Sequence, residues 1–210
     1  MSGSAGVGGN RKRTAVLISG RGSNMASLIK AAKDPAYPAE ITVVIADRAD
    51  APGLATATAD GIEAIALERT AFSGKASFEA ALHQAMMDRS IEVVCLAGFM
   101  RLLSADFVDR WYGKILNIHP SLLPDFKGLD AQAQALAAGV ERAGCTVHLV
   151  SADMDAGPIL QQASVPVEAG DTVESLSARI LAEEHRIYPE ALALLAAGRI
   201  RLEGDTISIL

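Results

Sequence analysis

The sequence has few of the features that mark several large classes of protein. Of its 210 residues only 4% are aromatic, and only two, Cys95 and Cys145, are cysteines. Both lie in or at the start of apolar, strand-like segments, which favours buried reduced thiols over a disulfide framework. No Cys-x-x-Cys pair and no Cys/His spacing of a metal site occurs, so no metal is expected.

Long apolar runs and an excess of basic charge are also missing. The longest apolar stretch, residues 93–100, has about eight residues, whereas a helix that crosses a bilayer needs about 20. The formal net charge is -6, and a general nucleic-acid binder would need a basic face. We therefore expect a cytoplasmic protein that binds small molecules and neither nucleic acid nor membrane.

The first thirteen residues are rich in Gly and Ser and end in three basic residues. They lack the apolar core of a signal peptide, and we interpret residues 1–13 as a flexible leader. Half of the residues are hydrophobic, which is enough to bury a sizeable core. No linker or internal repeat divides the remainder, so residues 14–210 are predicted to form a single domain.

The hydrophobic pattern predicts strands that alternate with helices in the first half of the chain. The predicted strands are 14–19, 41–45, 64–67, 93–97 and 114–118, and the predicted helices are 24–33, 52–59, 75–89 and 104–111. Strands that are apolar on both faces indicate a parallel sheet covered by helices on both sides. Later elements differ: two strand-like segments without a helix between them, a long helix, and two short strands joined by a turn. The strand-like segments are 144–150 and 159–167, the long helix is 172–197, and the turn is 203–205.

This order of elements predicts an α/β fold, a Rossmann-like three-layer sandwich. Its parallel N-terminal sheet would be extended by antiparallel C-terminal strands. Pro189 lies inside the pattern of the long helix and predicts a kink or a break into two helices near Tyr188.

The run Asn117-Ile118-His119-Pro120-Ser121-Leu122-Leu123-Pro124 is the strongest candidate for a reaction centre. Asn117 and His119 lie two residues apart at the end of a buried strand, and ligands of open α/β sheets bind beyond the carboxyl ends of strands. An Asn can donate to a developing oxyanion, and a His can move a proton near neutral pH. Asp155, in a later acidic turn, could orient the imidazole, although a simple turn-forming role stays open.

Two turns are candidates for ligand binding. Ser19-Gly20-Arg21-Gly22-Ser23-Asn24 lies between the first strand and the first helix, where backbone N–H groups can hold a phosphate. It matches neither the dinucleotide fingerprint nor the P-loop, and a tight turn with Ser23 or Asn24 as the helix cap is equally compatible. The segment 97–103 could line a flat ligand slot with apolar side chains, or close the core under its loop.

The remaining histidines and one acidic pair are ambiguous. His83 is expected to be solvated on a helix, and His148 to be a packed, hydrogen-bonded imidazole within a strand. His185 fits either role. Glu183 and Glu184 are solvated helix charges by default, but a carboxylate there could instead bind a ribose diol.

Taken together and in this order, the motifs resemble the phosphoribosylglycinamide formyltransferases. The resemblance covers residues 14–202. The motifs that carry it are Ile18-Ser19-Gly20-x-Gly22-Ser23-Asn24, Leu96-Ala97-Gly98-Phe99-Met100-Arg101, the run from Asn117 to Pro124, Asp155-x-Gly157-Pro158 and Glu184-His185-x-x-Tyr188-Pro189. It implies the formyltransferase fold and a reaction of purine biosynthesis. In that reaction the formyl group of the co-substrate 10-formyltetrahydrofolate passes to the amine of glycinamide ribonucleotide, without a metal.

The resemblance also implies roles for individual residues. Asn117 would donate to the oxyanion, His119 would stabilise it and carry protons, and Asp155 would hold His119. Thr146 would lie just behind these three. The substrate phosphate and ribose would be bound by Gly22, Ser23, Asn24 and Glu184. The folate would be bound by Lys75, Met100, Arg101, Leu102, Leu103, Ser151, Ala152, Asp153 and Met154.

Three positions depart from the family pattern. Residues 130–134, interpreted as a loop, read Asp-Ala-Gln-Ala-Gln where relatives carry Thr-His and a following Arg, so folate affinity or loop order is in question. Lys75 replaces an Arg, and Ala156 replaces a Gly that is common there. A 10-formyltetrahydrofolate hydrolase and a non-catalytic folate- or nucleotide-binding module remain alternatives, and the chain could be a monomer or a homodimer.

Overall fold

Seven strands form one sheet in the order β3-β2-β1-β4-β5-β6-β7. The computed structural model describes residues 11–204 and 206–210. The strands are β1 (Lys12–Ile18), β2 (Ala39–Ala46), β3 (Glu63–Ala66), β4 (Val93–Leu96), β5 (Ile115–His119), β6 (Arg142–Leu149) and β7 (Ile159–Pro166). The pairs among β1 to β5 are parallel, whereas β6 pairs antiparallel with both β5 and β7. The predicted parallel sheet with an antiparallel extension is confirmed.

Helices cover both faces of this sheet. They are α1 (Ser23–Ala32), α2 (Pro52–Ala59), α3 (Lys75–Met87), α4 (Ala105–Arg110), α5 (Ala131–Ala138) and α6 (Val173–Ala196), with a short 3-10 helix at Arg69–Ala71. Alternation along β1 shows the two layers: Val16 and Ile18 pack in the core with α1 and α6, and Ala15 and Leu17 pack in the core with α3 and α4. The three-layer arrangement is therefore as predicted.

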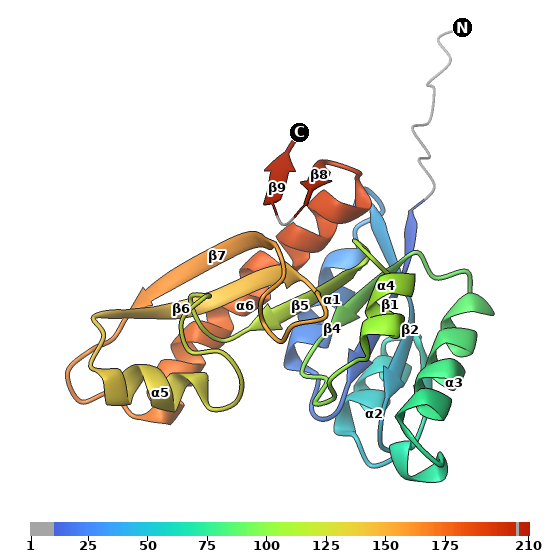
Figure 1. Ribbon diagram of the computed structural model, residues 1–210, viewed down its shortest axis with the longest axis horizontal. Coiled ribbons are helices and arrows are strands. Elements are labelled where there is room, and N and C mark those ends of the chain that lie inside the picture. The colour runs from blue at the N-terminus through green and yellow to red at the C-terminus, as the bar shows by residue number, and fades with distance from the viewer. Residues whose placement is uncertain (1–10, 205) are drawn as a thin grey trace, which may run out of the picture.

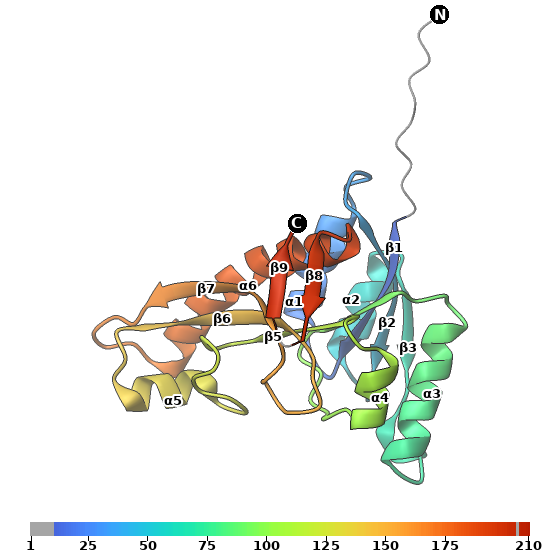
Figure 2. The ribbon, with the colours of Figure 1, turned by 45° about the horizontal axis from the view of Figure 1, so that its top comes forward.

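The two ends of the molecule differ. The β6–β7 hairpin and α5 form one end, and β3 with α2 and α3 forms the other (Figure 1). Helix α6 runs along the hairpin toward a second, small sheet of β8 (Ile200–Glu203) and β9 (Thr206–Ile209) (Figure 2). The predicted pair of short C-terminal strands is thus present. Cys95 and Cys145 are free and buried, and burial raises the pKa of each thiol to about 12.

The folded chain begins earlier than the sequence indicated. Strand β1 starts at Lys12, within the segment interpreted as a leader. The Arg11 guanidinium donates to the backbone carbonyls of Ala32 and Ala39 at 2.5 Å, tying the chain to the ends of α1 and β2. Residues 11–13 therefore belong to the fold, and the rest of the predicted leader lies outside the described residues.

Helix α6 continues through Pro189, so of the two predicted outcomes, a kink or a break, the break into two helices is wrong. Proline inside a helix costs about 3 kcal/mol because one backbone hydrogen bond is lost. Here Ile187 and Leu192, on either side of it, are both fully buried, and the Tyr37 hydroxyl donates to the Pro189 carbonyl at 2.6 Å. Tertiary packing outweighs the local penalty.

Residues 130–134 do not form a loop. Ala131 begins α5, and Ala131 and Ala135, one turn apart, are its buried residues. Asp130 precedes the helix in a left-handed conformation with φ of 56°. The sequence interpretation failed here because a face made of alanines gives only a weak helical pattern.

Tyr188 joins α6 to the middle of the sheet and provides a test of this packing. Its buried hydroxyl lies 2.9 Å from the carbonyl oxygen of Leu96 and 3.1 Å from that of Leu116, on adjacent strands. We expect Tyr188→Phe to lower the free energy of unfolding by about 1–2 kcal/mol, because buried acceptors lose their donor. Urea unfolding measures this, with Tyr112→Phe, at a 61% exposed position, as the control that should not change. Equal midpoints for the two variants would contradict the role of the hydroxyl.

Candidate active site

The direction of chain connection reverses between β1 and β4. From β1 the chain goes to β2 and β3 on one side, and from β4 to β5 on the other. Ligands of open α/β sheets bind at such a point because the loops leaving the two strands diverge. A pocket of about 260 Å³ lies here, lined by Ser19, Gly20, Arg21, Gly22, Ser23, Asn24, Ala97, Gly98 and Met100.

The turn after β1 leaves the first helical N–H groups of α1 without a side-chain cap. Gly22 is the N-cap with φ of 71°, and neither Ser23 nor Asn24 caps the helix. The capping alternative for this turn is therefore wrong. Gly53 of α2 packs against the same turn, since a Cβ there would lie 3.0 Å from the Gly20 carbonyl oxygen and the Gly53 N–H donates to that oxygen at 3.1 Å.

Asn24 and Glu184 form a buried pair across α1 and α6. Asn24 Nδ2 donates to Glu184 Oε2 at 2.7 Å, and the Asn24 Oδ1 atom is buried without a partner. Burial raises the pKa of the Glu184 carboxyl, while the Asn24 hydrogen bond and the nearby His119 oppose that shift. Glu184 is therefore not a solvated helix charge.

Asn117, His119 and Asp155 meet at the end of β5. His119 Nδ1 lies 3.5 Å from Asp155 Oδ2, and His119 Nε2 lies 2.9 Å from the Phe126 carbonyl. A carbonyl can only accept, so Nε2 carries a proton and Nδ1 faces the carboxylate. Asp155 has a left-handed φ of 49° and accepts from the Gly128 N–H at 2.9 Å, which fixes its carboxylate.

His148 is a member of this cluster that the sequence did not identify. It pairs with Asn117 across β5 and β6, and its Nε2 lies 3.1 Å from Asn117 Nδ2 and 3.8 Å from Asp155 Oδ1. Its Nδ1 lies 3.0 Å from the Leu149 carbonyl, which requires a proton on Nδ1 and leaves Nε2 as the acceptor for Asn117. Burial lowers the pKa of His148, which favours this neutral form. The prediction of a packed, hydrogen-bonded imidazole is correct, but its place beside Asn117 was missed.

Thr146 lies behind the loop that follows β5. It is opposite His119 in the β5–β6 pairing and is fully buried. Its hydroxyl donates to the Ser121 carbonyl at 2.7 Å and accepts from the Leu123 N–H at 3.1 Å. Thr146 therefore contacts the loop backbone rather than the side chains of the cluster.

The residues predicted to bind folate come from three segments. Met100, Leu102 and Met154 expose between half and two thirds of their surfaces, while Leu103 packs partly in the core. Arg101 does not point freely outward, because its Nε donates to the buried Asp47 carboxylate at 2.5 Å.

Backbone contacts locate the remaining members of this set. The Met100 N–H donates to Ser19 Oγ at 2.9 Å, which joins the Met100 loop to the turn after β1. Ser151, Ala152, Asp153 and Met154 lie between β6 and β7, directly before Asp155. Lys75 begins α3, one turn before Glu79, whose carboxylate accepts from the Ser104 N–H just after Leu103.

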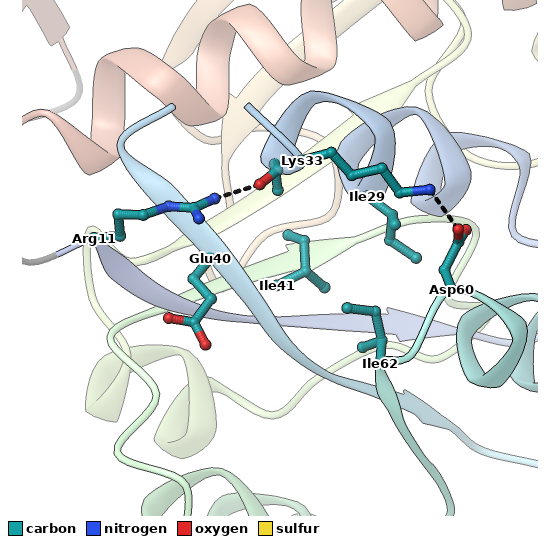
Figure 3. A pocket seen from close by; sticks show the side chains of 8 residues that line it. Arg11, Ile29, Lys33, Glu40, Ile41, Asp60 and Ile62 are labelled. Carbon is teal, nitrogen blue, oxygen red and sulfur yellow. Dashed lines mark hydrogen bonds and ion pairs between the residues drawn. The ribbon is translucent and has the colours of Figure 1, made fainter. Parts of the chain in front are cut away.

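A second, smaller hollow lies near the amino ends of β2 and β3. It has about 100 Å³ and is floored by Ile29, Ile41 and Ile62 (Figure 3). Its charged rim is already paired: Lys33 Nζ lies 2.5 Å from Asp60 Oδ1, and Arg11 is bound to backbone carbonyls. Ligand sites are usually several times larger and present unpaired polar groups, so this hollow is a packing feature.

The described residues also bear on metal binding and on membrane crossing. Within residues 11–204 and 206–210, no cluster of His, Cys, Asp or Glu is arranged to hold a metal ion. Among the helices of that same part of the chain, none has the length and apolar character to cross a membrane.

Comparison with known proteins identifies the family of this chain. Residues 12–192 match the family described as formyl transferase. The chain is 42% identical over 187 residues to a phosphoribosylglycinamide formyltransferase of Escherichia coli (strain K12), covering 89% of this chain and 88% of that protein. A crystal structure of glycinamide ribonucleotide transformylase 1 from Symbiobacterium toebii superposes with a TM-score of 0.94 at 48% identity, covering 97% of this chain and 99% of that one.

Longer relatives contain the same unit. A trifunctional purine biosynthetic protein adenosine-3 of Bos taurus is 49% identical over 192 residues, which are 91% of this chain. The chain spans only 19% of the length of that protein. The matched family and the full-length likeness to shorter relatives lead to one conclusion: the chain belongs to the formyl transferase family.

Proposed function

We propose that this protein transfers the formyl group of 10-formyltetrahydrofolate to the primary amine of glycinamide ribonucleotide, a step of purine biosynthesis. The observation that carries the proposal is the meeting of His119 and Asp155, 3.5 Å apart, with His119 near enough to the Asn24-bound Glu184 carboxyl to lower its pKa. An acid–base group and a site for a phosphorylated ribose would thus lie next to each other at the carboxyl ends of the strands. The names of the full-length relatives support the same reaction.

The substrate phosphate would bind in the turn after β1. The first N–H groups of α1 have no side-chain cap, and Gly22 before the helix and Ser23 and Asn24 at its start line the pocket, which suits an anion. Glu184 carries the acceptor oxygens that a ribose diol needs, and Asn24 fixes its carboxylate from the other side. This arrangement would direct the amine of the substrate toward the end of β5.

The chemistry divides among three side chains. The neutral amine attacks the formyl carbon, forming a C–N bond and placing negative charge on the formyl oxygen. Asn117 would donate to that oxygen, with its amide oriented by the neutral His148. His119 would carry the proton lost by the amine toward N10 of the folate, whose bond to the formyl carbon then breaks, and Asp155 would hold the ring.

The folate would lie over the exposed apolar side chains Met100, Leu102 and Met154. Exposed methionines adapt to flat ligands because their side chains are flexible and polarizable. Leu103 would support the slot from below, and residues Ser151, Ala152 and Asp153 would contribute backbone groups. Arg101 would act through Asp47 by holding the loop, and Lys75 would attract the acidic end of the folate.

We further propose that the protein works in the cytoplasm as a monomer or homodimer. The net charge of -6 is unfavourable for binding nucleic acid or anionic membranes. The ligands would therefore be the two small molecules alone.

One assay separates this proposal from its alternatives. With 10-formyltetrahydrofolate present, we expect loss of the formyl group only when glycinamide ribonucleotide is added. Absorbance of the released folate follows the reaction. Turnover without the ribonucleotide would indicate a hydrolase instead. Tight binding of both ligands without turnover would indicate a non-catalytic binding module.

The catalytic assignment predicts the effect of removing single groups. We expect His119→Ala and Asp155→Asn each to lower kcat at least about a hundredfold, the usual scale for a general acid–base group. Steady-state kinetics measures this, with Asp109→Asn on α4 as the exposed carboxylate control. A loss of less than about tenfold in both variants would refute the roles given to these side chains.

Replacement of Glu184 by Gln should affect stability and substrate binding in opposite directions. Because burial raises its pKa, the folded carboxyl resists ionisation while the unfolded one ionises near its ordinary value of 4.5, so stability falls as pH rises above that value. We expect Glu184→Gln, which can still accept from Asn24, to raise Tm near neutral pH and to leave it unchanged near about pH 4. The KM for glycinamide ribonucleotide should rise about tenfold, since one of the two acceptor oxygens becomes an NH2 group, which can only donate.

Calorimetry at the two pH values and substrate kinetics test both halves of this expectation. A lower Tm near neutral pH would mean that the carboxylate is stabilising despite its burial. An unchanged KM would remove Glu184 from the ribose site.

A further inference from the structure

A chain of polar contacts runs from the edge strand β7 to the active site. It starts at Gln162, whose Nε2 donates to the Leu123 carbonyl at 2.9 Å and to Thr146 Oγ1 at 2.8 Å. The Leu123 carbonyl can only accept, so the amide orientation of Gln162 is fixed. One side chain thus joins β7 to β6 and to the loop after β5.

The Thr146 hydroxyl, which accepts from Gln162, uses all of its hydrogen-bonding sites. Its single hydroxyl proton goes to the Ser121 carbonyl, and its two lone pairs accept from the Leu123 N–H and from Gln162. A hydroxyl has one donor and two acceptor sites, so none is left over. Loss of the Gln162 amide would leave the Leu123 carbonyl and one Thr146 lone pair without this partner.

The same loop delivers the carbonyl that meets the catalytic imidazole. Ser121 Oγ donates to the Asp125 carbonyl at 2.5 Å, and the next residue, Phe126, places its carbonyl 2.9 Å from His119 Nε2. The loop also lies tightly on the hairpin, because a Cβ at Gly144 would lie 2.7 Å from Leu122 Cδ2. The position of the Phe126 carbonyl therefore depends on how the preceding residues are held.

We propose that Gln162 is a positioning residue that fixes the loop of residues 120–126 and, through the Phe126 carbonyl, the ring of His119. This inference rests on the proposed function for its catalytic consequence. Gln162 itself is exposed, and its role is transmitted through backbone and through Thr146. Because it is exposed, its replacement leaves no cavity in the core.

The chain offers a matched control one residue away. Gln161 has the same side chain on the same strand but points to the other face, where its Nε2 donates to Glu190 at 2.7 Å. Gln162→Met and Gln161→Met remove the same amide with nearly the same shape. We expect Gln162→Met to lower kcat about ten- to hundredfold, the scale for misplacing a catalytic group by about an ångström. Its KM for glycinamide ribonucleotide should stay that of the wild type, and Gln161→Met should match the wild type in both constants.

A second readout does not depend on turnover. Nuclear magnetic resonance of labelled histidine rings reports the His119 Nε2 proton, which is hydrogen-bonded in the wild type. We expect its signal to shift or broaden by faster exchange in Gln162→Met and to be unchanged in Gln161→Met. His119→Ala assigns the signal by removing it.

The outcomes separate this inference from the proposed function. If the wild type shows no formyl transfer, the proposed function fails, while the ring signal still decides whether Gln162 fixes His119. If the wild type is active and Gln162→Met keeps either its kcat or its His119 signal, the positioning role is overturned. A fall in kcat together with a changed signal, in Gln162→Met alone, supports it.

Discussion

The antiparallel pairing of β6 with β5 is the constraint on which the site depends. Its register puts Asn117 opposite His148 and His119 opposite Thr146. The chain between these strands supplies the loop that meets His119, and the chain after β6 supplies Asp155. A shift of one residue would turn every one of these side chains to the other face of the sheet. The register is held by core residues such as Leu116, Cys145 and Val147, all fully buried, so the packing of the sheet also fixes the geometry of the candidate site.

Several groups in this site are held in conformations or environments that are unfavourable by themselves. Asp155 has a positive φ, and Glu184 is buried as a carboxyl group. Gly157 lies so close to β6 that a Cβ would come 1.8 Å from the Leu149 carbonyl oxygen, which fixes where the acidic turn can lie. The rest of the fold must compensate for each of these. Such local costs are typical where side chains are arranged for a ligand rather than for stability.

Much of the fold could be predicted because its signals are local. The apolar strands, the Ser104 cap of α4 and the Pro52 start of α2 each follow from neighbouring residues. The candidate residues were found because Asn117 and His119 follow a buried strand. Contacts between distant segments could not be predicted in this way: the pairing of Asn117 with His148 needs the strand register, and the Arg101–Asp47 ion pair joins the ends of β4 and β2. The continuous helix at Pro189 shows tertiary packing overriding a local rule.

Glu184 and Tyr188 stand one turn apart on α6, and each has a different partner. Glu184 accepts from Asn24, which lines the pocket beside the turn after β1, and the Tyr188 hydroxyl binds the carbonyls of Leu96 in β4 and Leu116 in β5. A helix rises about 6 Å over four residues, so one rigid helical turn, rather than a loop, sets the distance between the Asn24–Glu184 contact and the sheet. Exchange of one side chain for another leaves that spacing intact. Insertion or deletion of a single residue between them would rotate one relative to the other by about 100°. Length between these positions is therefore more tightly constrained than residue identity.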